Sequence, residues 1–163
     1  MSARDFLSSC VIEVSNVPID TTGAARTGDY YSLKDAQGIV FVIAQGAWAG
    51  GTPAVTLKQA TAVAGTGAKA LGMTEKYSKV ALTGTVNVLA AVVSDTFNLA
   101  ATANRIEMIE VSAVDLDRAG GYDCVGLDVA SPGANADLIC IVAILYGLRY
   151  QGDPAQRPDP KVD

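Results

Sequence analysis

The 163-residue sequence contains no histidine, and this absence removes several kinds of functional site. Histidine is the commonest general base, the partner of serine and cysteine nucleophiles, and the commonest metal ligand. A site built from lysine or carboxylate groups remains open, but the sequence argues against most kinds of enzyme. We therefore predict no catalytic residue, no metal site and no cofactor.

Cysteine is also scarce, with three residues at Cys10, Cys124 and Cys140. Their odd number, wide spacing and apolar neighbours predict buried, reduced thiols, and the absence of CxxC spacing argues against zinc. No secretion signal is recognisable at the N-terminus. The longest apolar run, residues 138–146, is about half as long as a membrane-spanning helix. We expect a protein that is made in a cytosol, stays soluble and has no membrane partner.

Charged residues make up only 18% of the chain, and the formal net charge is −5. The sequence therefore lacks the basic footprint that binds phosphate backbones, and we predict no nucleic-acid partner. Seven acids fall within residues 107–137 and four lysines within residues 58–79. A solvated surface is the simplest interpretation, and opposite-sign faces that guide subunits together are the alternative. Such low charge is also typical of a surface that a partner partly covers.

What the sequence does contain is short β-branched and aromatic runs separated by Gly, Pro and Asn. Strands are predicted at residues 10–14, 29–33, 38–45, 54–59, 68–71, 76–83, 96–99, 106–111, 122–129 and 138–146. The runs at 38–45 and 138–146 are apolar almost throughout, so we predict strands that are buried, the first of them on both faces. Strands of this length and spacing indicate an all-β protein with a β-sandwich or jelly-roll-like domain over residues 10–150.

Two stretches fit more than one secondary structure. Residues 86–93 contain the alanines of a helix, but no cap precedes them and valine dominates, so we predict irregular structure between residues 84 and 95. Residues 106–116 fit both a helical stripe and strand alternation. For these we predict a strand followed by one helical turn at residues 113–116, which the glycines at 120 and 121 terminate.

The two ends of the chain differ from the middle in composition. Residues 1–9 are predicted to form an extended N-terminal arm. Residues 152–160 contain three prolines and no apolar side chain larger than alanine or proline. Residues 151–163 are therefore predicted to form an extended C-terminal tail that is mobile unless a partner holds it.

Eight residues at strand ends or in these terminal segments are candidates for contacts with a partner. They are Arg4, Phe6, Leu7, Tyr30, Tyr31, Trp48, Tyr150 and Pro154. Aromatic side chains often anchor interfaces. At strand ends they also cap a core, and for each tyrosine and the tryptophan taken alone we favour that role. Phe6 and Leu7 stand in a polar stretch, where they would either dock on a neighbouring molecule or close this domain's own core.

Two short motifs suggest ligand binding but are incomplete. Residues 65–70, GTGAKA, have the spacing of a dinucleotide-binding fingerprint, yet no room for the necessary helix follows, so we predict a glycine turn. Residues 115–120, DLDRAG, match the first half of a calcium loop, but Gly126 stands where the loop needs its bidentate acid. A capped turn explains the second motif more simply.

Three segments together resemble a known family. They are AGGTPAVTLKQATAVAGTGAKAL at residues 49–71, IEVSAVDLDRAGGYDCV at 109–125 and YGLRY at 146–150. In order and spacing they are similar to the head decoration (cement) proteins of tailed bacteriophages, small proteins encoded beside the major capsid protein, over residues 11–154. The resemblance implies a jelly-roll-like sandwich without catalytic residues, bound to the outside of the capsid.

We therefore predict a virion structural protein that decorates the capsid exterior and stabilises it by bridging subunits of the major capsid protein. Its expected partners are that protein and further copies of itself, as a dimer or trimer on lattice symmetry axes. A head–tail connector or tail component is the alternative among structural proteins. A host- or carbohydrate-binding β-sandwich module on the virion is the alternative from another class, and an enzyme using carboxylates has little support.

Overall fold

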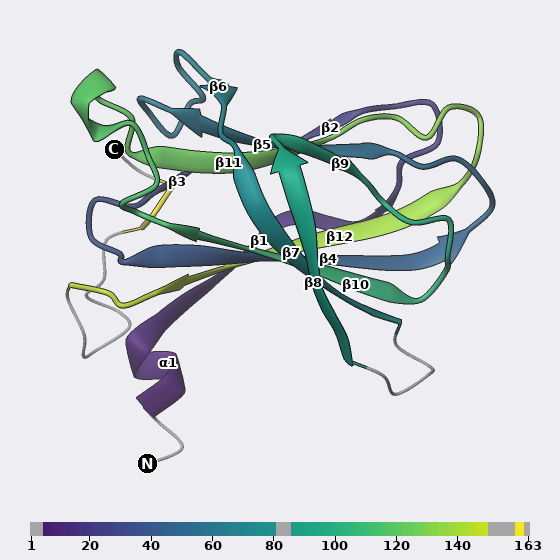
Figure 1. The fold of residues 1–163 in the computed structure, drawn as a ribbon, viewed down its shortest axis with the longest axis horizontal. Helices are drawn as coiled ribbons and strands as arrows, with labels where there is room; N and C mark the ends of the chain where they lie inside the picture. The colour runs from purple at the N-terminus through teal and green to yellow at the C-terminus, as the bar shows by residue number, and fades with distance from the viewer. Residues whose placement is uncertain (1–4, 81–85, 150–158, 162–163) are drawn as a thin grey trace.

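The computed structural model describes residues 5–80, 86–149 and 159–161, and in this part of the chain two antiparallel sheets pack against each other (Figure 1). The prediction of an all-β sandwich is confirmed. Sheet A has the order β1 (Cys10–Asp20), β12 (Asp137–Tyr146), β4 (Gly38–Trp48), β10 (Arg105–Ser112), β7 (Met73–Val80) and β8 (Val86–Ser94). Sheet B has the order β2 (Arg26–Thr27), β11 (Cys124–Val129), β5 (Ala54–Ala60) and β6 (Lys69–Ala70), with β3 (Tyr31–Ser32) paired to β11 and β9 (Thr96–Asn98) paired to β5.

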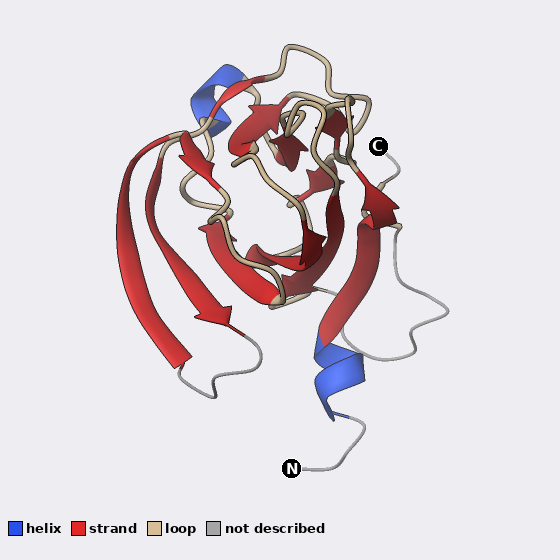
Figure 2. Ribbon diagram, turned by 90° about the vertical axis from the view of Figure 1, so that its right-hand side faces the viewer, coloured by secondary structure: helices blue, strands red, loops and turns tan. Residues whose placement is uncertain are grey.

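The chain passes back and forth between the two sheets. Successive strands change sheet at β1–β2, β3–β4, β4–β5, β6–β7, β8–β9, β9–β10, β10–β11 and β11–β12. The hairpin of β7 and β8 stays within sheet A and projects from one edge of the sandwich (Figure 2). Because consecutive strands mostly lie in opposite sheets, neither sheet is formed by one continuous stretch of the sequence.

The core lies between the sheets and is made by alternate residues of the long strands. From sheet A it receives Ile39, Phe41 and Ile43, whose partners across the ladder are inward-facing residues of β12. From sheet B it receives Leu57 and Leu127, which pair with each other. Each such side chain contributes about 1.5–3 kcal/mol on burial, so this layer supplies most of the stability of the fold.

The two long apolar strands are covered on one face only, and here the prediction for residues 38–45 is wrong. In β4, buried residues alternate with Val40, Val42 and Ala44, which are only half-buried. In β12, fully buried positions alternate with half-buried ones and with Leu138, which is 40% exposed. No layer of the described chain covers the outer side of these strands, although their sequence would suit one.

Other differences from the predicted elements are local. The stretch predicted to be irregular contains β8, which pairs along β7 from Val86 to Ser94. The strand predicted at 29–33 is reduced to β3. The helical turn predicted at 113–116 lies instead at η1 (Arg118–Gly120), where the Asp117 side chain accepts a hydrogen bond from the Gly120 amide and Gly121 closes the turn with φ 81°.

Residues 5–9 are helical where an extended arm was predicted, and the described part of the predicted tail, residues 159–161, contacts the domain. Residues Asp5–Ser9 form a short helix, α1, that leads directly into β1. At the other end, the Pro160 carbonyl accepts a hydrogen bond from the Ser32 amide, and the Lys161 ammonium lies 2.8 Å from Asp29 and 3.5 Å from Glu13. Residues 159–161 are thus held against β1 and β3 by this domain itself. Residues 151–158 lie outside the described part of the chain.

No helix in the described residues has the length and apolar character needed to cross a bilayer.

Candidate interaction surfaces

The structure explains both incomplete ligand motifs as turns. Gly65 and Gly67 adopt φ values of 75° and 62°, and the two-residue strand β6 follows them instead of a helix. Asp115 accepts a hydrogen bond from the Ser112 amide, and Asp117 caps η1 while its carboxylate lies 2.6 Å from the Lys69 ammonium. Within the described residues there is no group of three or more acidic or cysteine side chains arranged to hold a metal ion.

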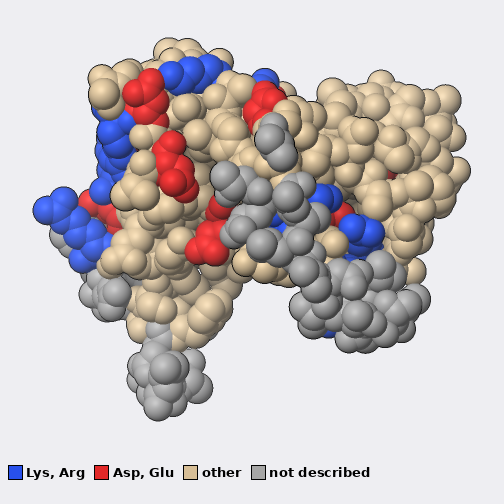
Figure 3. All heavy atoms as spheres, viewed as in Figure 1, with Lys and Arg blue, Asp and Glu red and all other residues tan. Residues whose placement is uncertain are grey.

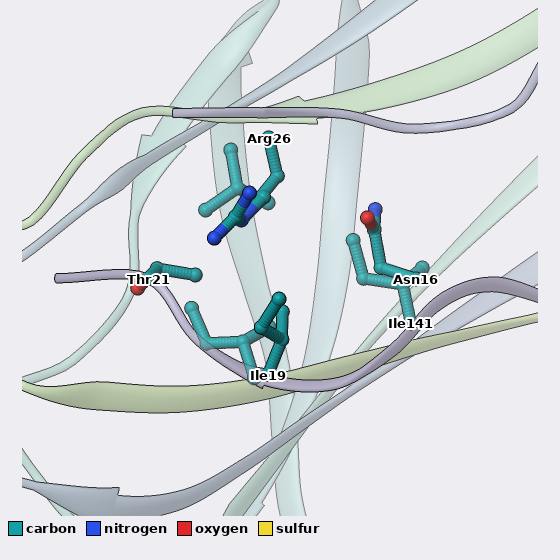
Figure 4. A pocket seen from close by; sticks show the side chains of 7 residues that line it. Asn16, Ile19, Thr21, Arg26 and Ile141 are labelled. Atoms are coloured by element: carbon teal, nitrogen blue, oxygen red, sulfur yellow. The ribbon is translucent and has the colours of Figure 1, made fainter. Parts of the chain in front are cut away.

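A recess between β1 and the edge of sheet B is too narrow to admit a water molecule (Figure 4). Its lining residues are Asn16, Ile19, Thr21, Arg26, Val129, Ile139 and Ile141. The Arg26 side chain reaches into it from β2, and Ile19 faces it from β1 (Figure 4). A recess of this size holds no substrate, and we assign it no binding role.

Lysines and acids that are far apart in the sequence pair within the molecule. Lys58 lies 2.6 Å from Asp128 across β5 and β11, and Lys34 lies 3.4 Å from Asp123. On the face of the molecule drawn in Figure 3, acidic and basic side chains lie close together in the left-hand part, while the right-hand end shows few charged side chains. Some of the acids and lysines that are segregated in the sequence therefore neutralise each other within the molecule. Fewer unpaired charges are left to guide subunits together.

Glu107 is a buried member of this charge pairing. Its side chain is 1% exposed on the inner side of β10 and accepts from Lys76 Nζ at 3.0 Å and Arg105 Nε at 2.5 Å. The Lys76 ammonium also lies 4.1 Å from the centre of the Phe97 ring in sheet B. This ion network links strands β7 and β10 to the opposite sheet, and it has the satisfied geometry of a structural element.

Asp137 is a second buried carboxylate, at the start of β12. It is fully buried, and the Gln45 amide donates to both of its carboxylate oxygens at 3.1 and 3.0 Å. Burial raises the pKa of Asp137, and the nearby charge of Asp20 acts in the same direction, while the hydrogen bonds from Gln45 lower it. The backbone carbonyl of Asp137 accepts from the Thr21 amide and hydroxyl, so this group fastens the end of β1 to β12.

Two of the candidate contact residues are buried, in the core-capping role that the sequence favoured for each of them taken alone. Tyr31 is fully buried in the main core, with its ring 6.2 Å from that of Phe41. Tyr30 is 6% exposed and packs with Ala60 and Cys124 on the outer side of sheet B. Both tyrosines cap hydrophobic clusters of this domain, as aromatic residues at strand ends commonly do.

The other predicted contact residues are placed as follows. Phe6 is 59% exposed on α1, so it is available to a neighbour. Trp48 is half-buried, and its indole nitrogen donates to the Gly51 carbonyl at 2.8 Å, which fixes the turn after β4. Arg4, Tyr150 and Pro154 lie outside the described residues, as does the side chain of Leu7.

The largest candidate surface was not among the predictions, and it is the side of sheet A that points away from sheet B. We call it the outer face. Strand register sets its side chains in rows across the strands. The first row is Ile12, Ile144, Val40 and Glu110; the second is Val14, Val142, Val42, Met108 and Tyr77; the third is Cys140, Ala44, Ile106 and Lys79. Charged groups stand only at the ends of these rows, so the middle of the face is continuously apolar.

Side-chain exposures show that the described part of the chain leaves this apolar face open. Among the described residues, the large hydrophobic side chains with substantial exposure include Ile12 at 47%, Val14 at 46%, Leu138 at 40% and Tyr77 at 39%, all on the outer face. Contiguous apolar patches on monomers rarely exceed a few hundred Å² unless a partner covers them.

The outer side of sheet B provides an internal comparison, because it carries polar and charged pairs beside the small cluster of Tyr30, Ala60 and Cys124. There, Lys58 pairs with Asp128, and the hydroxyls of Thr56 and Thr96 lie 3.1 Å apart across β5 and β9. One sandwich therefore presents a hydrated side and a side without polar side chains at its centre. A sheet that faces water normally carries alternating polar residues, and the outer face of sheet A lacks them at its centre.

Tyr146 forms one border of the outer face. A Cβ atom at Gly38 would lie 2.5 Å from its hydroxyl, so the ring lies across a position where only glycine fits. The hydroxyl donates to Glu110 at 2.6 Å. Burial raises the pKa of Tyr146 to about 12, and the hydrogen bond to Glu110 adds to this shift.

No protein-family model matches the sequence, and no curated protein matches it. Among solved structures, the crystal structure of the SPBc2 prophage-derived protein YomS matches with a TM-score of 0.47 and 10% sequence identity, over 83% of this chain and 91% of that chain. At this TM-score and identity, the likeness says nothing of what the present chain does.

Proposed function

We propose that this chain is a structural protein of a tailed-phage virion, which decorates the capsid exterior and stabilises it by bridging subunits of the major capsid protein. The observation that carries the proposal is the apolar outer face of sheet A, next to a polar outer side of sheet B. Such a molecule acts by contact. The resemblance of residues 49–71, 109–125 and 146–150 to capsid decoration proteins supports the same role.

The physical task of such a protein suits this scaffold. A shell that contains packaged DNA is under outward pressure, and a protein bound to two capsomers at once resists their separation through avidity. It needs a stiff body whose contact surfaces do not yield. Two sheets that share a continuous core and are joined by the Glu107 ion network provide that stiffness.

A second contact element lies beside the outer face. Helix α1 projects from the start of β1 on the side of sheet A away from sheet B (Figures 1 and 2). Its exposed Phe6 is the kind of aromatic anchor that fills a pocket on another protein. We propose that α1 makes the capsid contact that was predicted for the N-terminal arm.

The proposal is tested with purified expanded heads that lack this protein. Wild-type protein should bind in hundreds of copies per particle, counted by quantitative mass spectrometry, and should raise the temperature at which the heads open. Phe6→Ser should raise the Kd for heads about tenfold, since loss of a contact worth about 1.4 kcal/mol has that effect, and occupancy should fall accordingly at protein concentrations below the wild-type Kd. Val114→Ser, which changes a side chain that is 85% exposed elsewhere, is the matched control and should bind normally.

Two results would favour the alternatives. About a dozen copies or fewer at one vertex would indicate a connector, because ring symmetry limits its number. Failure to bind heads together with specific binding on a glycan array would indicate a receptor-binding module.

A further inference from the structure

We infer that the outer face of sheet A binds the outer face of a second copy of this chain, so that the protein is a two-fold dimer of sandwiches. This inference stands on the sheet itself and does not depend on the proposed capsid role. It would also explain how the protein bridges two capsid subunits, because a dimer carries two α1 helices.

The area of the face matches what a dimer requires. Four strands, β1, β12, β4 and β10, at about 4.8 Å spacing span about 19 Å. The nine residues from Leu138 to Tyr146 span about 30 Å at about 3.4 Å per residue. The face therefore covers about 600 Å² per copy, or about 1,200 Å² for the pair, which lies at the lower bound of specific protein interfaces.

The chemistry of the face is compatible with burial. In its middle row, the side chains of Val14, Val142, Val42 and Met108 bring no polar side-chain group that would need a partner once water is excluded. Half-buried valines and isoleucines on two such sheets can interdigitate at the ~10 Å spacing of packed sheets. Burying them removes apolar surface from water at low desolvation cost.

The charges at the border of the face select a second copy over an unrelated partner. Glu110 stands in the first row on β10, and Lys79 stands in the third row at the neighbouring strand β7. A two-fold axis along the second row exchanges the first row of one copy with the third row of the other. Glu110 then lies opposite Ile106 of the second copy, and the second copy's Lys79 is offset sideways by about one strand spacing, ~4.8 Å, across the ~10 Å between the two sheets, so the two long side chains can meet in the interface. The same contact forms twice, as an isologous interface requires.

The test is the mass of the full chain in solution, measured by sedimentation and by light scattering. Wild-type protein should have twice the monomer mass of 16.8 kDa at micromolar concentration. Ile12→Lys should weaken association on the order of 100-fold or more, because each interface would bury two unpaired ammonium groups. Val114→Lys adds the same charge at an exposed site off the face and should remain dimeric.

Cys140 provides a second readout that does not depend on a variant's stability. It is half-buried in the third row of the outer face, while Cys10 and Cys124 are buried. In the dimer its thiol should react slowly with maleimide, and dilution of wild-type protein into the monomer range should accelerate the reaction at least tenfold. Ile12→Lys should react at the monomer rate at every concentration, while its circular-dichroism spectrum remains that of the wild type.

A monomeric mass for wild-type protein at 100 µM would overturn the inference, as would equal Cys140 reactivity at high and low concentration. If wild-type protein is monomeric alone but loses Cys140 reactivity on heads, the face belongs to the shell protein and the dimer is wrong. A dimer that does not bind heads would refute the proposed function and leave this inference standing.

Discussion

Removing the Glu107 carboxylate is the perturbation that probes the interior of the sandwich most directly. Glu107 is 1% exposed and is the shared partner of Lys76 and Arg105, which are themselves 12% and 17% exposed. The substitution Glu107→Ala leaves two cations close together between the sheets without their counterion. The Lys76 ammonium keeps its contact with the Phe97 ring. This cation–π contact offsets a small part of the stabilisation that is lost with the carboxylate.

The expected magnitude follows from what buried ion pairs cost when one partner is removed. That loss is typically about 3–5 kcal/mol, because the remaining charge stays buried and uncompensated. For a domain of this size each kcal/mol lowers the melting temperature by about 2–4 °C, so Glu107→Ala should melt about 6–20 °C below the wild type.

The assay is urea unfolding followed by circular dichroism, with midpoints compared at a common slope. The matched control is the apolar triple variant Lys76→Met, Arg105→Met, Glu107→Leu, which removes all three charges together. Replacing a whole buried network by packed apolar groups is often neutral or stabilising, so the triple variant should recover most of the loss. If the triple variant is as unstable as Glu107→Ala, the cost comes from packing and the reasoning is wrong.

Three further predictions concern single groups. In urea unfolding, Asp137→Asn should be more stable than the wild type at pH 7, and by a smaller margin at pH 4. The folded-state pKa of the Asp137 carboxyl is raised, so the wild-type protein loses stability as the pH rises through that pKa, whereas the amide does not titrate and can also donate to the Gln45 carbonyl. A variant whose stability relative to the wild type is lower at pH 7 than at pH 4 would contradict this. Glu110→Gln should lower the pKa of Tyr146 from about 12 in an ultraviolet titration, and an unchanged value would mean that Glu110 does not act on it. Lys161→Gln removes the ion pair with Asp29 and should lower the free energy of unfolding by about 0.5–1 kcal/mol at low salt. The loss should be smaller in 1 M NaCl, where the Debye length is about 3 Å, and a loss that does not depend on salt would point to packing.

The sequence was sufficient for the fold class because the alternation of strand residues and the glycine turns are local signals. Strands β4, β5, β11 and β12 lie at or within a few residues of their predicted positions. Strand β8 was missed because the alanines and valines at 86–93 are compatible with both a helix and a strand. Its pairing with β7, which is not a local signal, determines that it is a strand. The length of β3 also depends on its partner in sheet B, which no local pattern encodes.

The outer face was harder to predict than the fold, although its signal is present in the sequence. Residues 38–45 and 138–146 are apolar at both odd and even positions, which indicates two apolar sides. We interpreted the second side as covered by this chain, because sequence cannot say which layer covers a strand. For Tyr30 and Tyr31 the sequence left both roles open, since an aromatic residue at a strand end looks alike whether it anchors a partner or closes a core, and the structure shows the core role.

The position of β12 has a consequence for how the molecule is made. This strand is near the end of the described chain, yet it is inserted between β1 and β4, two of the earliest strands. Until residues 137–146 have left the ribosome, β1 lacks the strand that it pairs with in the described sheet and β4 has an open edge, so the central part of sheet A forms only after β12 has been made. Pairing over such sequence distances is slow. A chain broken off before this strand would lack the middle of its sheet, and only completed molecules would be competent to assemble.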